Sequence, residues 1–186
     1  MPTSERAGRG ALCRYRVRTS LGEFLAGLRG GRLAELELPG TWELSARPPL
    51  LGGQEGAAGR RLGRELGEYL AGRRRQFTVP VAPVGTAWQR RVWTALRRIP
   101  WGEVRTYGQV ARMVGAAGAA RAVGGACGSN PLVIIIPCHR VVAVNGLGGF
   151  GRSQRRLDLK RLLLDLERPG VADILRGAGR GVAQPG

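Results

Sequence analysis

Residues 106–129, TYGQVARMVGAAGAARAVGGACGS, predict two short helices joined by a tight turn. Thr106 and Gln109 have the spacing of a capping box, in which a hydroxyl and an amide side chain satisfy the first backbone groups of a helix. We expect the helices over about 107–114 and 119–129, with glycines turning the chain between them. This order of elements is the outline of a helix-turn-helix.

The second of these helices is nearly bare of side-chain bulk. Alanine or glycine stands at most of its positions: Ala119, Ala120, Ala122, Gly124, Gly125, Ala126 and Gly128. A helix that reads bases in the major groove presents several long polar side chains, whereas this one offers Arg121. Two interpretations remain open. The helix allows close approach of its backbone to a ligand, or it packs tightly against a neighbouring helix.

Another helix is expected upstream of this pair. Thr86 and Gln89 form a second capping box, and Pro100 ends the helix that they begin. Apolar side chains follow one side of this helix: Trp88, Val92, Leu96 and Ile99. The second half of the chain therefore predicts a mostly helical domain.

The N-terminal part predicts a small α/β domain. Residues 12–19 alternate apolar side chains with arginine, which is the pattern of a half-buried strand. Turn signals at 20–22 and 29–31 indicate that further strands follow in an antiparallel meander. A helix is expected over about 58–72, because one of its faces carries Leu62, Leu66, Tyr69 and Leu70.

The domain boundary is expected in the segment 79–85, VPVAPVG, because two prolines interrupt any regular element there. The predicted organisation is a disordered N-terminus, two domains and a flexible glycine-rich tail. Their ranges are 1–10 for the N-terminus, 11–80 for the α/β domain, 81–170 for the helical domain and 171–186 for the tail.

The chain is strongly basic. Its 30 lysine and arginine residues outnumber 13 aspartate and glutamate residues, and more than half of the net charge of +17 lies in residues 83–170. This charge favours phosphate, RNA or another anionic surface as a partner, although a GC-rich genome also produces arginine-rich proteins. No stretch reaches the roughly 18 apolar residues of a membrane-spanning helix. We expect a soluble protein of a reducing compartment with no membrane partner.

Residues 132–142, LVIIIPCHRVV, hold the strongest chemical signal. The β-branched run 133–136 predicts a buried strand, and Pro137 ends it just before Cys138 and His139. A thiol with a pKa of about 8.5 is only a few per cent thiolate at neutral pH, and burial makes ionisation harder. A reactive cysteine here therefore needs a base and an acid that orients the base. Neighbours on extended chain point apart, so the two side chains would need a tight turn or a bridging water.

The three cysteines predict neither a disulfide framework nor a metal site. Cys13, Cys127 and Cys138 form no CxxC pair and no even set. A zinc site would need all three together with His139, and two adjacent ligands fit a tetrahedral site poorly. We interpret Cys13 and Cys127 as small buried hydrophobes.

The stretch Gly85–Glu167 resembles the O6-alkylguanine-DNA alkyltransferase family. The matching runs, in order, are GTAWQRRVWTALRRIPWGEVRTYGQVA (85–111), RAVGGACGSNP (121–131), IPCHRVV (136–142) and KRLLLDLE (160–167). The resemblance implies an α/β N-terminal domain of ribonuclease-H-like topology and a mostly α C-terminal winged helix-turn-helix domain, which holds the cysteine.

The resemblance also implies a function in DNA repair. A methyl or other alkyl group passes from O6-alkylguanine, and by extension O4-alkylthymine, in double-stranded DNA to Cys138 after base flipping. The thioether product is irreversible, so each molecule acts once, as a monomer and without a cofactor. We expect it in the cytoplasm, on the nucleoid of a prokaryote, or in the nucleus of a eukaryote.

Roles implied by the resemblance fall on individual residues. Cys138 matches the alkyl acceptor, His139 the base that acts through a water, and Glu167 the carboxylate that orients the histidine. Asn130 matches the asparagine that holds the active-site turn, and Tyr107 the tyrosine that contacts phosphate and approaches the flipped guanine. The implied DNA contacts, besides Tyr107, are Ala120, Arg121, Gly124 and Arg140, with Arg121 entering the base stack in place of the guanine.

The implied substrate pocket includes Val141 and a loop that departs from the family pattern. That loop is Phe150-Gly151-Arg152, where relatives usually have a tyrosine followed by small residues. Arg152 either narrows the pocket or joins a phosphate-facing patch. Three rival functions are a relative without activity that only flags alkylated bases, a plain helix-turn-helix regulator, and a cysteine hydrolase. The acceptor cysteine, the bare second helix and the lack of a recognisable oxyanion motif disfavour them in turn.

Overall fold

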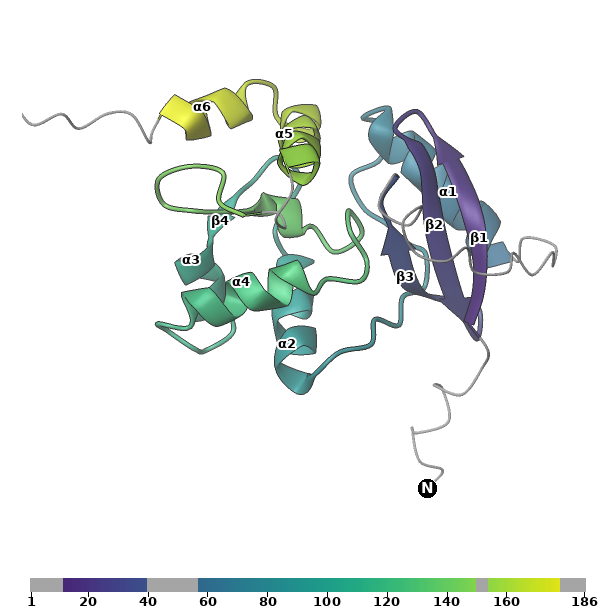
Figure 1. Cartoon of the computed structure of the whole chain (residues 1–186), viewed down its shortest axis with the longest axis horizontal. Helices are drawn as coiled ribbons and strands as arrows, with labels where there is room; N and C mark the ends of the chain where they lie inside the picture. Colours follow the sequence, from purple (N-terminus) through teal and green to yellow (C-terminus); the bar gives the residue numbers. More distant parts are fainter. Residues whose placement is uncertain (1–11, 40–56, 150–153, 178–186) are drawn as a thin grey trace, which may run out of the picture. The chain divides into compact units, whose positions relative to one another are not determined.

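The computed structural model describes three stretches of the chain, which are residues 12–39, 57–149 and 154–177. The chain divides into two compact units. Unit 1 comprises Met1–Val84 with Pro131–Val133, and unit 2 comprises Gly85–Asn130 with Ile134–Gly186. Figure 1 gives the element labels that are used below.

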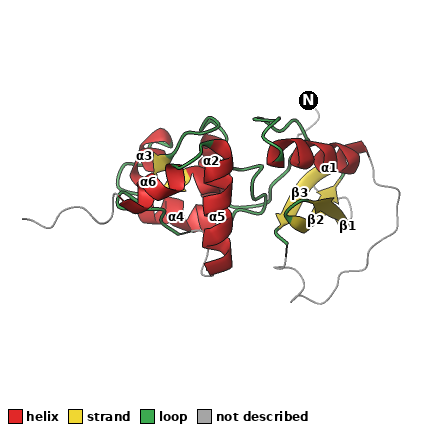
Figure 2. Cartoon of the chain, turned by 90° about the horizontal axis from the view of Figure 1, so that it is seen from above, coloured by secondary structure: helices red, strands yellow, loops and turns green. Residues whose placement is uncertain are grey.

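Unit 1 is a three-stranded antiparallel sheet with one helix. The strands follow the chain in the order β1 (Leu12–Thr19), β2 (Gly22–Arg29) and β3 (Arg32–Glu37), and α1 spans Ala57–Leu70. This arrangement confirms the expected meander and helix. Helix α1 runs alongside the sheet (Figure 2), and a Cβ atom at Gly59 would lie only 2.9 Å from the ring of Tyr15. A glycine is therefore what allows α1 to approach β1 this closely.

The sheet of unit 1 continues with two short parallel bridges beside β3. Leu33 pairs with Val81, and Leu36 pairs with Leu132. The backbone N–H of Leu36 donates to the carbonyl of Pro131 at 2.7 Å. Pro131–Val133, which lie within the predicted domain 81–170, group with unit 1 in this way.

Unit 2 is mostly helical. Its elements are α2 (Ala87–Leu96), β4 (Arg105–Thr106), α3 (Tyr107–Met113), α4 (Ala120–Gly128), a 3-10 turn (Cys138–Arg140), β5 (Val141–Val142), α5 (Gln154–Glu167) and α6 (Val171–Gly177). Both predicted capping boxes are present, at Thr86 with Gln89 and at Thr106 with Gln109. Helices α2 and α4 are joined by the buried indole of Trp93, which donates to the Ala126 carbonyl at 2.8 Å. The structure thus has mixed α/β content, as expected.

Two sequence-based expectations are wrong. Residues 133–136 are buried but form no continuous strand, because Ile134 and Ile135 lie in a turn between the bridge residues Val133 and Ile136, and Ile134 has a φ of 72°. A β-branched run indicates burial as much as it indicates pairing, so the two were confused. The predicted tail 171–186 begins with helix α6, because Val171 and Ala172 are buried with Leu147 and Leu164; residues 178–186 lie outside the described stretches.

Among the described residues, no helix combines the length and the apolar character that crossing a membrane requires. The predicted disordered N-terminus at 1–10 lies outside the described part of the chain.

Candidate active site

A tight turn presents the candidate acceptor cysteine. The backbone N–H of Cys138 donates to the Ile136 carbonyl at 2.8 Å, and that of Arg140 donates to the Pro137 carbonyl at 3.0 Å. The chain then enters β5, which pairs in parallel with β4 directly before α3 begins. The turn is therefore held between a proline on one side and a short sheet on the other.

Asn130 ties this turn to the end of α4. Its side-chain amide donates to the Ile136 carbonyl at 2.9 Å and to the sulfur of Cys138 at 3.0 Å. The thiol is buried, with 4% of the residue exposed. Burial raises the pKa of Cys138, and the Asn130 hydrogen bond and the charge of Lys160 offset only part of that effect. The resting group is a thiol, so its reaction as a nucleophile needs a base.

A histidine, a carboxylate and a guanidinium form a buried cluster beside the cysteine. Nε2 of His139 lies 2.9 Å from Oε1 of Glu167. Arg140 donates from Nη2 to the same oxygen at 2.7 Å and from Nε to Oε2 at 2.8 Å. The side chains are 0%, 1% and 8% exposed for His139, Glu167 and Arg140, so water screens none of these contacts appreciably.

The protonation states of this cluster follow from its contacts. Burial alone would raise the pKa of Glu167, but the hydrogen bonds from His139 and Arg140 outweigh it and lower the pKa to about 2. Burial lowers the pKa of His139, and the attraction of Glu167 offsets only part of that change. An ionised carboxylate only accepts hydrogen bonds, so Nε2 carries the ring proton and Nδ1 is the basic nitrogen. The histidine is thus a neutral, oriented base.

A buried lysine holds the loop that follows β5. Nζ of Lys160 donates to the carbonyls of Val141 at 2.7 Å, Leu147 at 2.6 Å and Gly149 at 3.2 Å. Burial lowers the pKa of Lys160 to about 8. The hydroxyl of Tyr107 also donates to the Gly149 carbonyl, at 3.0 Å. Two side chains from α5 and α3 therefore fix the same loop.

Gly148 is required where this loop passes α3. Its φ is +68°, and a Cβ atom there would lie 2.9 Å from the backbone nitrogen of Ala143 and 3.0 Å from the ring of Tyr107. Both the left-handed backbone and the close approach exclude a larger side chain. The ring of Tyr107 is thereby packed directly against the loop.

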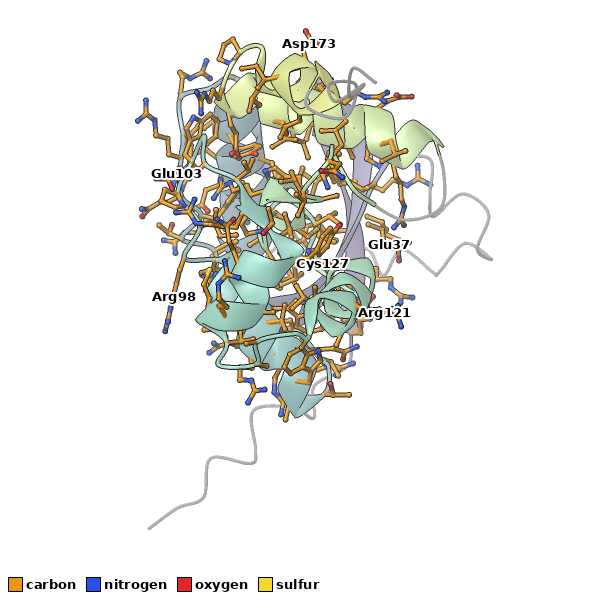
Figure 3. The ribbon with its side chains drawn as sticks, turned by 90° about the vertical axis from the view of Figure 1, so that its left-hand side faces the viewer. Glu37, Arg98, Glu103, Arg121, Cys127 and Asp173 are labelled. Atoms are coloured by element: carbon orange, nitrogen blue, oxygen red, sulfur yellow. The ribbon has the colours of Figure 1, made fainter. Side chains whose placement is uncertain are left out.

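A cavity of about 590 Å³ lies in unit 2 next to these groups. Its lining residues are Tyr107, Ala120, Arg121, Gly124, Cys127, Gly128, Ala143, Gly148 and Gly149. Three of them, at positions 120, 124 and 128, form one stripe of α4, whereas Val123 and Ala126 are buried on its other side. One face of the bare helix therefore packs and another borders the cavity, so close approach of a ligand to its backbone stays a prediction. Figure 3 labels Arg121 and Cys127 on this helix.

Electrostatic coupling links the cavity to the candidate acceptor. Cys138 is not among the described residues that line the cavity. Burial, followed by the negative charge that Cys127 and Cys138 carry when ionised, raises the pKa of Tyr107 to about 12. Burial and Cys138 likewise raise the pKa of Cys127 to about 12. Ionisation of the acceptor thiol and of these two residues of the cavity wall is therefore linked.

Sequence comparison identifies the family of the chain. Residues 87–169 match the family described as 6-O-methylguanine DNA methyltransferase, DNA binding domain. A methylated-DNA–protein-cysteine methyltransferase of Methanosarcina acetivorans is 49% identical over 109 residues, which are 58% of this chain and 68% of the relative. The chain belongs to the methylated-DNA–protein-cysteine methyltransferase family. A second family member, from Mycolicibacterium paratuberculosis, is 50% identical over 105 residues, which are 56% of this chain and 62% of that relative, a little under two thirds of its length.

Solved structures of this methyltransferase family extend the likeness beyond the aligned sequence. The O6-methylguanine methyltransferase of Mycobacterium tuberculosis has a TM-score of 0.72 at 34% identity, covering 94% of this chain and 97% of that one. The M. tuberculosis OGT in complex with DNA has a TM-score of 0.68 at 36% identity, covering 82% of this chain and 91% of that one.

Most of the site residues expected from the family resemblance lie close together in unit 2. Cys138 contacts Asn130, and His139 contacts Glu167. The residues at the cavity are Tyr107, Ala120, Arg121 and Gly124. Two expected residues are placed differently. Val141 is fully buried in β5 and, like Cys138, is not among the described lining residues of the cavity, and the guanidinium of Arg140 is buried against Glu167.

The remaining expectations concern residues outside this cluster. Phe150, Gly151 and Arg152 lie outside the described stretches, so the proposed pocket wall stays a prediction. In the described part of the chain, no group of three His, Cys, Asp or Glu side chains is placed to hold a metal ion. Cys13 is exposed on β1, which corrects its interpretation as a buried hydrophobe.

Sequence reasoning assigned no role to Lys160 and none to Cys127 beyond packing. A signal for Lys160 was available, because it is the only lysine of a chain whose other basic residues are all arginine. A compact ammonium can reach several converging carbonyls, which a planar guanidinium cannot do equally well. No comparable signal marked Cys127, since its place at a cavity depends on the register of α4 against α3.

Proposed function

We propose that this chain repairs DNA by taking a methyl or other alkyl group from O6 of guanine onto Cys138. The observation that carries the proposal is the buried thiol beside a neutral histidine, whose ring is oriented by an ionised carboxylate. The names of the relatives agree with this chemistry. The same site would accept O4-alkylthymine, whose alkyl group is attached to an equivalent exocyclic oxygen.

The reaction is a displacement at the alkyl carbon. His139 takes the thiol proton, through a bridging water, and the sulfur of Cys138 attacks the carbon as a thiolate. The bond between that carbon and O6 breaks, and its electron pair stays on the guanine. The proton that His139 took from the thiol then passes to the guanine. The products are a thioether and unmodified guanine. Since no thiol can exchange with a thioether, the protein acts once and needs no cofactor.

The proposed substrate is double-stranded DNA with the damaged base flipped out of the helix. O6 of a stacked guanine is not accessible to in-line attack, so the base must leave the stack. Arg121 is exposed at the cavity rim and would fill the space that the base leaves, while the bare stripe of α4 would lie along the minor groove. Tyr107 would contact the phosphate and the flipped guanine.

The family relationship supports finer assignments of fold and state. We infer a ribonuclease-H-like topology for unit 1 and a winged helix-turn-helix for unit 2, with α3 and α4 as its helical pair. We infer a monomer that works in the cytoplasm on the nucleoid, or in the nucleus of a eukaryote. The basic charge of the chain supports binding to DNA through phosphates with little dependence on sequence.

Stoichiometry tests the proposed function. A limiting amount of protein is mixed with an excess of duplex that carries O6-methylguanine, and the unmodified guanine formed is measured over time. The product should rise to one equivalent of protein and then stop. Repeated turnover would exclude a thioether product and therefore the proposed mechanism.

A further inference from the structure

Arg140 makes more contacts to the histidine–carboxylate pair than any role in DNA binding would explain. Its Nε and Nη2 atoms bond to different oxygens of Glu167, at 2.8 and 2.7 Å, in the forked geometry that a guanidinium allows. Its Nη1 atom donates to the Ile99 carbonyl at 2.6 Å. The residue is 6% exposed, so its charge is turned toward the protein interior.

These contacts join three segments around His139. Ile99 follows α2, Arg140 ends the 3-10 turn, and Glu167 is the last residue of α5. The backbone N–H of Gly102 adds a further hydrogen bond to Oε2 of Glu167, at 3.2 Å. Both oxygens of Glu167 therefore accept hydrogen bonds, and rotation of its carboxylate would break two or more of these hydrogen bonds at once.

The charge of Arg140 also acts on the histidine. A buried carboxylate next to an imidazole favours the protonated ring. Arg140 shares that carboxylate, and its charge, like that of Lys160 on α5, opposes protonation of His139. The charged groups that act on His139 are thus Glu167 on one side of the balance and Arg140 and Lys160 on the other. With Arg140 in place, Glu167 orients the ring without converting it into the cation.

We propose that Arg140 is a positioning residue for alkyl transfer, which holds Glu167 so that His139 stays oriented and able to accept a proton. This inference rests on the proposed function and adds a fourth member to the Cys138, His139 and Glu167 set. It also replaces the expected DNA contact of Arg140 with a role inside the protein.

Two substitutions separate the charge of Arg140 from its paired hydrogen bonds to the two oxygens of Glu167. Arg140→Met removes both, and Arg140→Lys keeps the charge but bonds one oxygen at a time. Arg161→Met is the matched control, because Arg161 forms an ion pair with Asp158 at 2.8 Å on the surface of the same helix α5. For each protein, three quantities are measured: the single-turnover rate with an O6-methylguanine duplex across pH, the rate of Cys138 labelling by iodoacetamide across pH, and the Kd for undamaged duplex.

Arg140→Met should slow alkyl transfer by roughly 10- to 100-fold, a part of the 10²- to 10⁴-fold that a positioned base contributes. The midpoints of both pH profiles should move to higher pH, because His139 is then drawn toward its protonated form. Arg140→Lys should restore the wild-type midpoint but only part of the rate. Arg161→Met should match the wild type, and the Kd for undamaged duplex should be unchanged in all variants.

The proposal is overturned if folded Arg140→Met has the wild-type rate and midpoint, or if its duplex affinity falls as much as its rate. If Arg140→Met does not fold, the rate of Arg140→Lys tests the proposal. A full wild-type rate in that variant would contradict the need for paired hydrogen bonds from Arg140 to Glu167. The labelling profile needs no DNA. It therefore tests Arg140 even if the wild-type protein transfers no methyl group, a result that would refute the proposed function separately.

Discussion

Among the described residues, each unit buries one glutamate, and the two glutamates have different partners. In unit 1, Glu65 of α1 is 1% exposed and accepts hydrogen bonds from the Thr78 hydroxyl, from the Thr78 N–H at 2.8 Å and from the Val79 N–H at 3.1 Å. An arginine, Arg74, lies 3.9 Å away. In unit 2, Glu167 is bonded to His139, Arg140 and the Gly102 N–H.

Burial and a lowered pKa do not distinguish the two carboxylates. For both, burial alone would raise the pKa, and hydrogen bonds reverse that effect. The two carboxylates differ in the groups to which they are hydrogen-bonded. Glu65 accepts hydrogen bonds from a threonine hydroxyl and two backbone amides, which fixes the chain after α1. Glu167 is instead hydrogen-bonded to a histidine, a base that follows a thiol in the sequence. A buried acid marks a reactive site only when its partner can move a proton.

Exchanging each glutamate for glutamine should distinguish the roles of the two glutamates most clearly. Glu167→Gln should slow alkyl transfer by roughly 100- to 1,000-fold, because a neutral amide no longer stabilises the oriented base. Glu65→Gln should leave the rate within about twofold and lower only the free energy of unfolding, by roughly 1–3 kcal/mol. Single-turnover rates and thermal unfolding measure the two effects.

The rates must be compared at a temperature at which both variants are folded, since Glu167→Gln also leaves Arg140 buried without its counter-charge. Equal losses of rate in the two variants would mean that Glu167, like Glu65, only supports the fold.

Acid unfolding should show how much ionised Glu167 stabilises the folded chain. The pKa of Glu167 is about 2 in the folded chain, below the ordinary value of an unfolded chain. Its stabilisation is therefore complete above about pH 5 and is lost as the pH falls toward 2, on the order of 3 kcal/mol in all. Urea unfolding of wild type and Glu167→Gln at pH 6 and pH 3 tests this. An equal loss of stability in both proteins would contradict the assignment.

Lys160 sharpens the comparison, because it is a buried charge that donates to the backbone carbonyls of Val141, Leu147 and Gly149. Lys160→Met should lower the free energy of unfolding by roughly 1–3 kcal/mol, since buried carbonyls lose their donor. It should slow alkyl transfer by about tenfold, because small displacements of a site are costly. Arg161→Met on the same helix is the control for both measurements. A stability loss without any loss of rate would show that the loop does not shape the site.

Cys127 should show the smallest effect. It lines the cavity, and its pKa of about 12 keeps it a thiol at neutral pH, as Cys138 is. The base His139 follows Cys138 in the sequence, so we expect Cys138 and not Cys127 to be activated. Cys127→Ser should change the single-turnover rate by less than about threefold, or under 1 kcal/mol. A loss as large as that of Glu167→Gln would place the second thiol in the reaction.

The sequence predicted the elements that local chemistry determines. Both capping boxes, the meander and the helix pair are present because hydroxyl, amide and glycine positions specify them within a few residues. Residues 133–136 were misassigned because burial there comes from contacts distant in sequence, and Ile134 takes a left-handed backbone that no local rule anticipates. Helix α6 was missed because its apolar face is short, and it depends on Leu147 and Leu164.

The sequence named residues that the structure brings together in the candidate site, but it did not predict the hydrogen bonds between them. The family resemblance assigned roles to Cys138, His139, Glu167 and Asn130, and the structure brings these four into one cluster of unit 2. Which way Arg140 points could not be read from the sequence, because an arginine next to a reactive turn can face phosphate or the interior with equal local chemistry. The choice depends on where α5 ends, at Glu167.

The central claim is that Cys138 is the acceptor, and one mass measurement tests it most directly. The protein is incubated with a duplex that carries one O6-methylguanine, and its intact mass is determined before peptide mapping locates the change. We predict a gain of one methyl group on Cys138, with Cys13 and Cys127 unmodified. An unchanged mass, or a methyl group mapped to either of the other cysteines, would contradict the account.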